Sequence, residues 1–163
     1  MFRLFLADDH AIIRQGIKRA LTDMTVVGEA STAEELLKGL PKQLCDVLLL
    51  DLALPGESGV HLIPKIKALC PHVRIIVFSM FSEPEYARHA LEAGAAGYVL
   101  KTASMQDLHD AIRQVLAGHS YLSRPFDEQE ITEPRPAVKR LSPREEQIMQ
   151  LIGAGKQMRD IAE

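Results

Sequence analysis

The stretch Val47-Leu48-Leu49-Leu50-Asp51-Leu52-Ala53-Leu54-Pro55-Gly56 decides how the chain can fold, because it places one carboxylate at the end of an unbroken apolar run. Four consecutive aliphatic residues without alternation are typical of a strand buried on both faces, as in a parallel sheet covered by helices. Pro55 and Gly56 then stop the run. Ligands of such sheets bind beyond the carboxyl ends of the strands, which makes Asp51 a candidate functional residue. From this stretch alone, an acidic residue that caps a loop is an equally good interpretation.

Length and composition indicate a soluble globular protein with one domain and an appendage. The chain has 163 residues, of which 47% are hydrophobic and 25% are charged, whereas single domains most often have about 100 to 150 residues. The net charge of -3 shows no basic bias, so a nucleic-acid role would need a local motif. Cys45 and Cys70 lack metal or redox spacing, which favours a reducing cytoplasm. The apolar stretch 2–7 reaches Asp8 too soon for a signal peptide or a membrane span.

Short apolar runs alternate with helical periodicities along the first two thirds of the chain. Helical spacing of apolar residues follows each of the five runs. This alternation predicts an α/β domain, a doubly wound five-stranded parallel sheet with helices on both faces. The predicted strands are 2–7, 25–29, 47–50, 73–78 and 97–100. The predicted helices are one that contains residues 13–21, one that Ser31 or Thr32 caps, residues 60–70, residues 85–93 and one that starts at Ser104.

The composition changes after the fifth unit. We expect the α/β domain to cover residues 1–120 and a linker to cover residues 121–140, which carry prolines and no periodicity. Residues 141–163 begin with Ser142-Pro143, a helix start, and form a truncated helical segment. That segment has too few apolar side chains to close a core alone.

Polar side chains follow four of the predicted strands, and parallel pairing would bring them to one edge of the sheet. Crowded carboxylates repel one another, and a hard cation such as Mg²⁺ relieves that repulsion. Lysine and a hydroxyl can hold the oxygens of a transferred phosphoryl group, and an aspartate can be its nucleophile. These residues are Asp8, Asp9, Asp51, Ser79 and Lys101.

Residues 1 to about 120 resemble the receiver domain of a two-component response regulator, which has a flavodoxin-like fold. The resemblance rests on the order and spacing of several short pieces rather than on any one of them. The matching pieces are Asp8-Asp9-His10, Asp51 with Leu54-Pro55-Gly56 and Gly59, Ser79, Gly97-Tyr98, and Lys101.

The resemblance implies that a sensor histidine kinase phosphorylates Asp51. It implies that Mg²⁺ is held by Asp8, Asp9, Asp51 and the backbone carbonyl of Ala53. Lys101 would pair with the phosphoryl oxygens. Ser79 would donate to the phosphoryl oxygens and form the switch pair with Tyr98, which rotates inward as the Ser79 hydroxyl moves. The alternative is that either is a routine strand-end residue, with Tyr98 simply packing an amphipathic ring. His10 is expected to be a helix-start or rim residue rather than a metal ligand.

The tail is similar to the start of a LuxR-type helix-turn-helix domain, through Leu141-Ser142-Pro143-Arg144-Glu145 and Asp160-Ile161-Ala162-Glu163. This points to the NarL/FixJ family of transcription regulators, which bind DNA and dimerise on activation. The recognition helix of such a domain should follow residue 163, so we expect this chain alone to bind DNA poorly. An amphipathic helix that docks on the receiver is the alternative for the tail.

Two positions depart from receivers that lose their phosphoryl group quickly. Ala53 lies two residues after Asp51, and Phe81 two residues after Ser79. Neither side chain can orient a water, so we predict a long-lived phosphoryl group. We expect no enzymatic activity other than the receiver's catalysis of its own phosphorylation and dephosphorylation. The alternatives are a module that signals through protein contacts alone and an aspartyl-phosphate phosphatase, which would usually carry a second aspartate where Ala53 stands.

Overall fold

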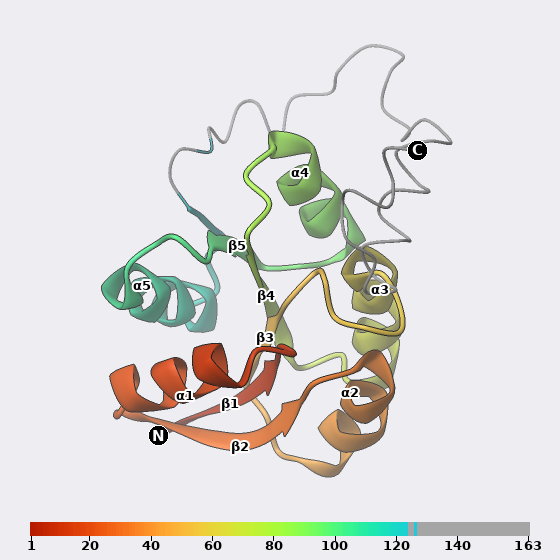
Figure 1. Cartoon of the computed structure of the whole chain (residues 1–163), viewed down its shortest axis with the longest axis horizontal. Coiled ribbons are helices and arrows are strands. Elements are labelled where there is room, and N and C mark those ends of the chain that lie inside the picture. Colours follow the sequence, from red (N-terminus) through yellow and green to blue (C-terminus); the bar gives the residue numbers. More distant parts are fainter. Residues whose placement is uncertain (124–125, 127–163) are drawn as a thin grey trace.

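The fold is organised around one sheet of six parallel strands, in the order β2-β1-β3-β4-β5-β6 (Figure 1). The computed structural model describes residues 1–123 and 126. The strands are β1 (Phe2–Ala7), β2 (Met24–Ala30), β3 (Val47–Leu50), β4 (Arg74–Ser79), β5 (Gly97–Leu100) and β6 (Tyr121–Leu122). The predicted doubly wound parallel sheet is therefore confirmed.

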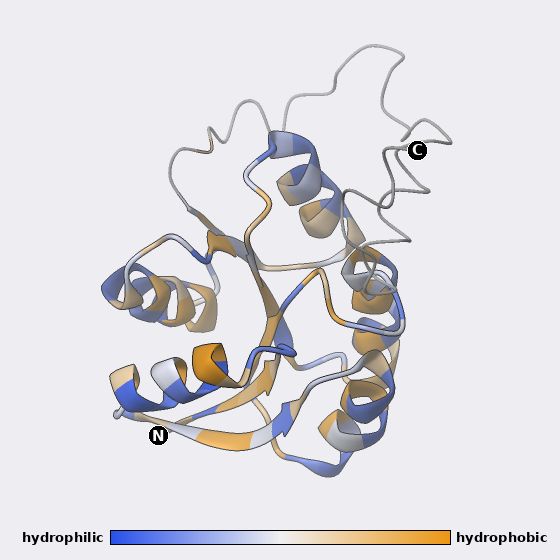
Figure 2. Cartoon of the chain, in the orientation of Figure 1, coloured by the Kyte–Doolittle hydropathy of each residue, from blue (hydrophilic) through white to orange (hydrophobic). Residues whose placement is uncertain are grey.

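Helices cover both faces of the sheet (Figure 1). On one face lie α1 (Ala11–Ala20) and α5 (Met105–Leu116), and on the other lie α2 (Ala33–Gly39), α3 (Gly59–Leu69) and α4 (Pro84–Ala93). A short 3₁₀ turn, η1 (Leu40–Lys42), follows α2. Each face has its own buried apolar cluster, and the outer sides of the helices are largely hydrophilic (Figure 2).

Strand β3 shows why its sequence has no polar alternation. Successive side chains of a strand point to opposite faces, and here both faces are covered. Leu48 and Leu50 belong to the cluster under α2, α3 and α4, whereas Val47 and Leu49 belong to the cluster under α1 and α5. All four are at most 3% exposed, as the unbroken aliphatic run predicted.

Two of the predicted helix starts are fixed by side-chain caps. The Thr32 hydroxyl accepts a hydrogen bond from the Glu35 backbone N–H at the start of α2. At the start of α5, Ser104 and Asp107 form a reciprocal capping box. Each cap satisfies backbone donors that the first helical turn leaves unpaired.

The sheet has a sixth strand that the sequence did not predict. Gly118, with φ of +94°, turns the chain after α5, and Tyr121 and Leu122 then pair with Gly97 and Tyr98 of β5. A two-residue strand is too short to show periodicity, and the sequence pattern therefore predicts a linker at these residues. The rest of that linker, except residue 126, and the predicted helical segment 141–163 lie outside the described residues. Among the helices that the structure describes, none is long and apolar enough to span a membrane.

Candidate functional site

The strand register brings the predicted site residues to one edge of the sheet. Asp51 is the first residue after β3, and its backbone N–H donates to the Ala7 carbonyl at 2.9 Å. Likewise the Lys101 N–H donates to the Ser79 carbonyl at 2.8 Å, and the Asp8 N–H to the Ala30 carbonyl at 3.0 Å. Because the strands are parallel, their carboxyl ends meet at the same edge.

Lys101 bridges two buried carboxylates at this edge. Its Nζ lies 2.7 Å from Asp8 Oδ2 and 2.9 Å from Asp51 Oδ2. The three side chains are only 5%, 6% and 3% exposed, respectively. Two carboxylates therefore share one ammonium group in a site almost closed to water.

Burial shifts the ionisation of this cluster. Burial raises the pKa of Asp51 above its usual value, against the attraction of Lys101, and the charge of Asp8 adds to the rise. For Lys101, burial lowers the pKa, but the attraction of Asp51 and the contact with Asp8 outweigh burial and raise it overall. Lys101 is consequently held in its charged form, and the second carboxylate has no cation of its own within the triad.

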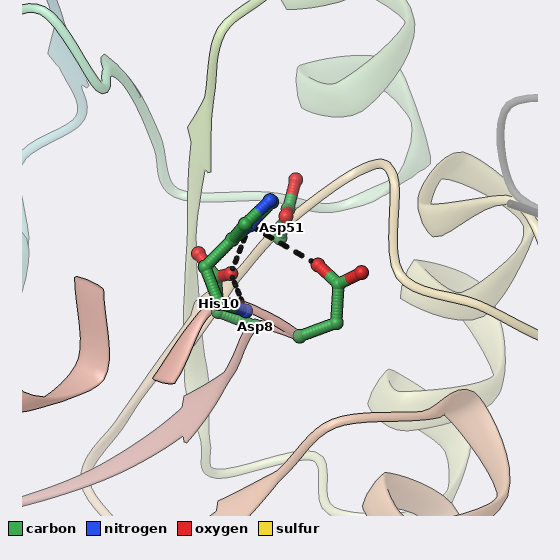
Figure 3. Close-up of side chains that lie close together, drawn as sticks. Asp8, His10 and Asp51 are labelled. Carbon is green, nitrogen blue, oxygen red and sulfur yellow. Dashed lines mark hydrogen bonds and ion pairs between the residues drawn. The ribbon is translucent and has the colours of Figure 1, made fainter. Parts of the chain in front are cut away.

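His10 and Asp9 complete the acidic cluster. The backbone N–H of His10 donates to Asp8 Oδ1 at 2.8 Å, and its Nδ1 lies 2.9 Å from the same oxygen and 3.2 Å from Asp9 Oδ1. Asp8, His10 and Asp51 lie close together in Figure 3. Ligand atoms of Asp8, Asp9, His10 and Asp51 all lie within 4.8 Å of one another. Three carboxylates with a single lysine are a donor set that fits a hard divalent cation.

The loop after β3 holds Asp51 in place. The Ala53 backbone N–H donates to Asp51 Oδ1 at 3.0 Å, so the peptide of Ala53 lies beside the carboxylate. A role for its carbonyl in metal binding stays a prediction. Gly56 adopts a positive φ of +109°, and a Cβ on Gly59 would lie 2.7 Å from Leu52 Cα. The motif after Asp51 therefore needs glycine at position 56 for its backbone conformation and at position 59 for lack of space.

The predicted switch residues are linked through the backbone of Phe81. Ser79 Oγ accepts from the Phe81 N–H at 3.1 Å, and the Tyr98 hydroxyl donates to the Phe81 carbonyl at 2.7 Å. Ser79 and Tyr98 are both 0% exposed. Burial raises the pKa of Tyr98 well above its usual value, against a hydrogen bond with Ser79 that lowers it. Tyr98 is therefore inward and neutral.

Sequence reasoning missed three contacts at or near the site. It predicted a helix-start or rim residue at His10. His10 occupies the N-cap position of α1 without a side-chain capping bond, and its ring contacts two carboxylates. Arg14 donates to the Asp8 backbone carbonyl and pairs with Glu29. Phe126 packs edge-on against Tyr98. Adjacency to Asp8 and Asp9 was the only signal for His10, and the other two contacts had none.

A doubly wound parallel sheet that ends in an acidic cluster around one buried lysine defines a receiver module of two-component signalling. The chain belongs to the response regulator receiver domain family, whose model matches residues 4–113. It is a receiver of the LuxR/NarL type and serves two-component signalling and transcription regulation.

Similar proteins support this assignment. The chain is 35% identical to the response regulator UvrY of Escherichia coli K12, over 100% of this chain and 79% of that protein. It is 36% identical to the oxygen regulatory protein NreC of Staphylococcus epidermidis, over 99% of this chain and 81% of that protein.

Solved structures agree. A LuxR-family response regulator from Aurantimonas has a TM-score of 0.73 and 36% identity, and the match covers 79% of this chain and 94% of that chain. The isolated receiver of RcsB from Salmonella enterica, with a beryllofluoride phosphomimetic, has a TM-score of 0.70 and 31% identity over 80% of this chain and 96% of that one. RcsB dimers bound to DNA have a TM-score of 0.73 and 30% identity over 99% of this chain and 81% of that one.

Proposed function

We propose that Asp51 accepts a phosphoryl group from a sensor histidine kinase and that the phosphorylated receiver controls transcription. The observation that carries the proposal is the position of Asp51, which is buried at the end of β3 and ion-paired at 2.9 Å to Lys101. This ion pair favours the ionised carboxylate, the nucleophilic form, against the effect of burial.

The reaction transfers one phosphoryl group between two residues. An Asp51 oxygen forms a bond to phosphorus while the bond from phosphorus to the kinase's imidazole nitrogen breaks, and the electron pair of that bond stays with the imidazole. Lys101, 2.9 Å from Asp51 Oδ2, would attract the phosphoryl oxygens, and the Ser79 hydroxyl would donate to one of them. Asp8, Asp9 and Asp51 would hold a bound Mg²⁺, with the Ala53 carbonyl, and the ion would neutralise charge on the phosphoryl oxygens.

The output side of the proposal follows the family. We infer that the chain works in the cytoplasm, that activation produces a homodimer, and that DNA is the final partner, as DNA is for the RcsB dimers. With a net charge of -3, these 163 residues should bind DNA weakly, because phosphate contacts need basic side chains. A turnover phosphatase is disfavoured because Ala53 cannot act as acid or base.

Phosphorylation with a small phosphodonor and Mg²⁺ tests the proposal. The mass of one phosphoryl group should appear on the peptide that contains Asp51. It should be absent in D51N and without Mg²⁺, and present in D46N, in which an aspartate at the opposite end of the sheet is changed. Phosphorylation of D51N to the wild-type extent would refute the assignment of the nucleophile.

The same preparation measures how long the phosphoryl group lasts. Ala53 is apolar, and the Phe81 ring stacks on Tyr86 with 4.7 Å between centroids. Neither side chain can orient an attacking water, so we expect a phosphoryl lifetime of many minutes. Replacing Ala53 by Asn, a residue that can orient water, should shorten it; loss within a minute in the wild type would contradict the expectation.

A further inference from the structure

The segment that follows α5 contacts the switch residue Tyr98 from two sides. We call residues 121–123 together with Phe126 the strap. The Ser123 N–H donates to the Tyr98 carbonyl at 2.9 Å, which extends the pairing of Leu122 with Tyr98. The Phe126 ring meets the Tyr98 ring edge-on, with 5.3 Å between centroids and 89° between planes. The strap therefore holds both the backbone and the ring of Tyr98.

The strap is itself anchored to the domain. The Phe126 N–H donates to the Ser123 carbonyl at 3.0 Å, and Ser123 is only 3% exposed. Leu122 and Phe126 pack against the apolar cluster under α2, α3 and α4. Edge-on aromatic pairs contribute beyond their buried area, so a shift of the Tyr98 ring changes the free energy of the strap.

On its other side, Tyr98 contacts the phosphorylation site through one residue. The Tyr98 hydroxyl donates to the Phe81 carbonyl at 2.7 Å, and the Phe81 N–H donates to Ser79 Oγ at 3.1 Å. Contacts thus run without a gap from Ser79, at the carboxyl end of the strand next to β3, to Phe126. A phosphoryl group that drew Ser79 Oγ away from the Phe81 N–H would change the position of the Phe81 peptide, whose carbonyl accepts from the Tyr98 hydroxyl.

We propose that the position of the strap depends on whether Asp51 is phosphorylated. A phosphoryl group on Asp51 holds Tyr98 inward, and the inward Tyr98 fixes Ser123 and Phe126 in place. The chain that follows the strap is thereby coupled to phosphorylation through Phe126. This inference rests on the proposed function of Asp51. Coupling between two sites is reciprocal, so the strap must strengthen binding at Asp51 by the same factor by which binding protects the strap.

The test uses the full chain with Mg²⁺ and beryllofluoride, which mimics a phosphoryl group. Calorimetry gives the affinity for beryllofluoride, and NMR gives hydrogen exchange rates of the Ser123 and Phe126 amides. We expect saturation with beryllofluoride to slow exchange at both amides by at least about fivefold. The affinity of F126A for beryllofluoride should be lower than that of the wild type. The ratio of the two affinities should equal the factor by which beryllofluoride slows amide exchange in the wild type.

Two further variants separate coupling from stability. F126L keeps apolar volume without the ring and should show an intermediate loss of affinity. F2A removes a half-exposed phenylalanine at the far end of β1 and should leave the affinity unchanged. If F126A only lost stability, its loss of beryllofluoride affinity would not equal the slowing of amide exchange that beryllofluoride causes in the wild type.

The outcomes distinguish the two proposals. If the wild type binds beryllofluoride, D51N does not, and the strap amides exchange equally with and without it, then the strap inference is wrong and the proposed function stands. The strap inference is also wrong if F126A and F2A bind beryllofluoride equally well. If the wild type fails to bind beryllofluoride, the proposed function fails and the strap inference with it.

Discussion

Two ion clusters lie at opposite ends of the same sheet, and they differ in charge balance and burial. At the amino end, Arg3 and Asp46 form a two-pronged pair with distances of 3.0 and 3.1 Å, and their side chains are 41% and 28% exposed. At the carboxyl end, Lys101 is 5% exposed and serves two carboxylates. The first cluster is balanced and touched by water, so it only joins β1 to β3. The second is buried and has two carboxylates for one lysine, so we expect a ligand that brings positive charge to stabilise it.

The largest expected effect comes from Lys101. In K101M, Asp8 and Asp51 face each other in a buried site without their shared cation, and we expect the free energy of unfolding to fall by about 3 kcal/mol. Urea unfolding without divalent cations measures the change.

K65M is the matched control. Lys65 pairs with Glu57 at 2.6 Å, but the lysine is 54% exposed, and exposed pairs contribute about 0.5 kcal/mol. If K101M lost no more stability than K65M, the buried triad would not be the electrostatic centre that its geometry indicates.

The second largest change in the free energy of unfolding is expected at Asp51, and here the substitution should stabilise the protein. Burial raises the pKa of Asp51 from its ordinary value of 3.8, so its ionisation opposes folding. Removing that charge in D51N should stabilise the protein at neutral pH by roughly 1 kcal/mol, since Lys101 keeps Asp8 at 2.7 Å.

The pH dependence checks the cause. A protonated Asp51 is compatible with folding below pH 3.8, and the wild type loses this advantage as the pH rises through the folded pKa. The stability gain of D51N should therefore disappear in acid and grow toward neutral pH. A gain that stayed constant across that range would exclude the charge as its origin.

The smallest effect comes from Asp46. The hydrogen bond from Arg3 lowers the pKa of Asp46 below its ordinary value of 3.8, against some burial. This contribution is present above pH 3.8 and is lost as the pH falls through the folded pKa. D46N should cost about 0.5 kcal/mol at neutral pH, since solvent screens the pair. Unfolding of D46N and D51N across the acidic range should give opposite trends; parallel trends would contradict the contrast between the two ends.

Much of the site could be predicted because, in a parallel sheet, the residues at the carboxyl edge directly follow the apolar strand runs in the sequence. Asp51 ends a buried aliphatic run, and Lys101 follows another apolar run. Polar residues in that position must lie at the carboxyl edge, where the structure places them. The sixth strand could not be predicted, because Tyr121 and Leu122 have no periodicity and pair only where β5 offers a free edge.

The sequence by itself determined the layered sheet, its parallel strands and the residues at its carboxyl edge, because hydrophobic periodicity and chain order decide these features. Only the tertiary structure decided that Lys101 is shared between Asp8 and Asp51. Only the tertiary structure brought Phe126 onto Tyr98. Both depend on side-chain distances between residues far apart in the chain, and pattern and propensity do not contain those distances. The contact between Tyr98 and the strap is therefore a product of packing.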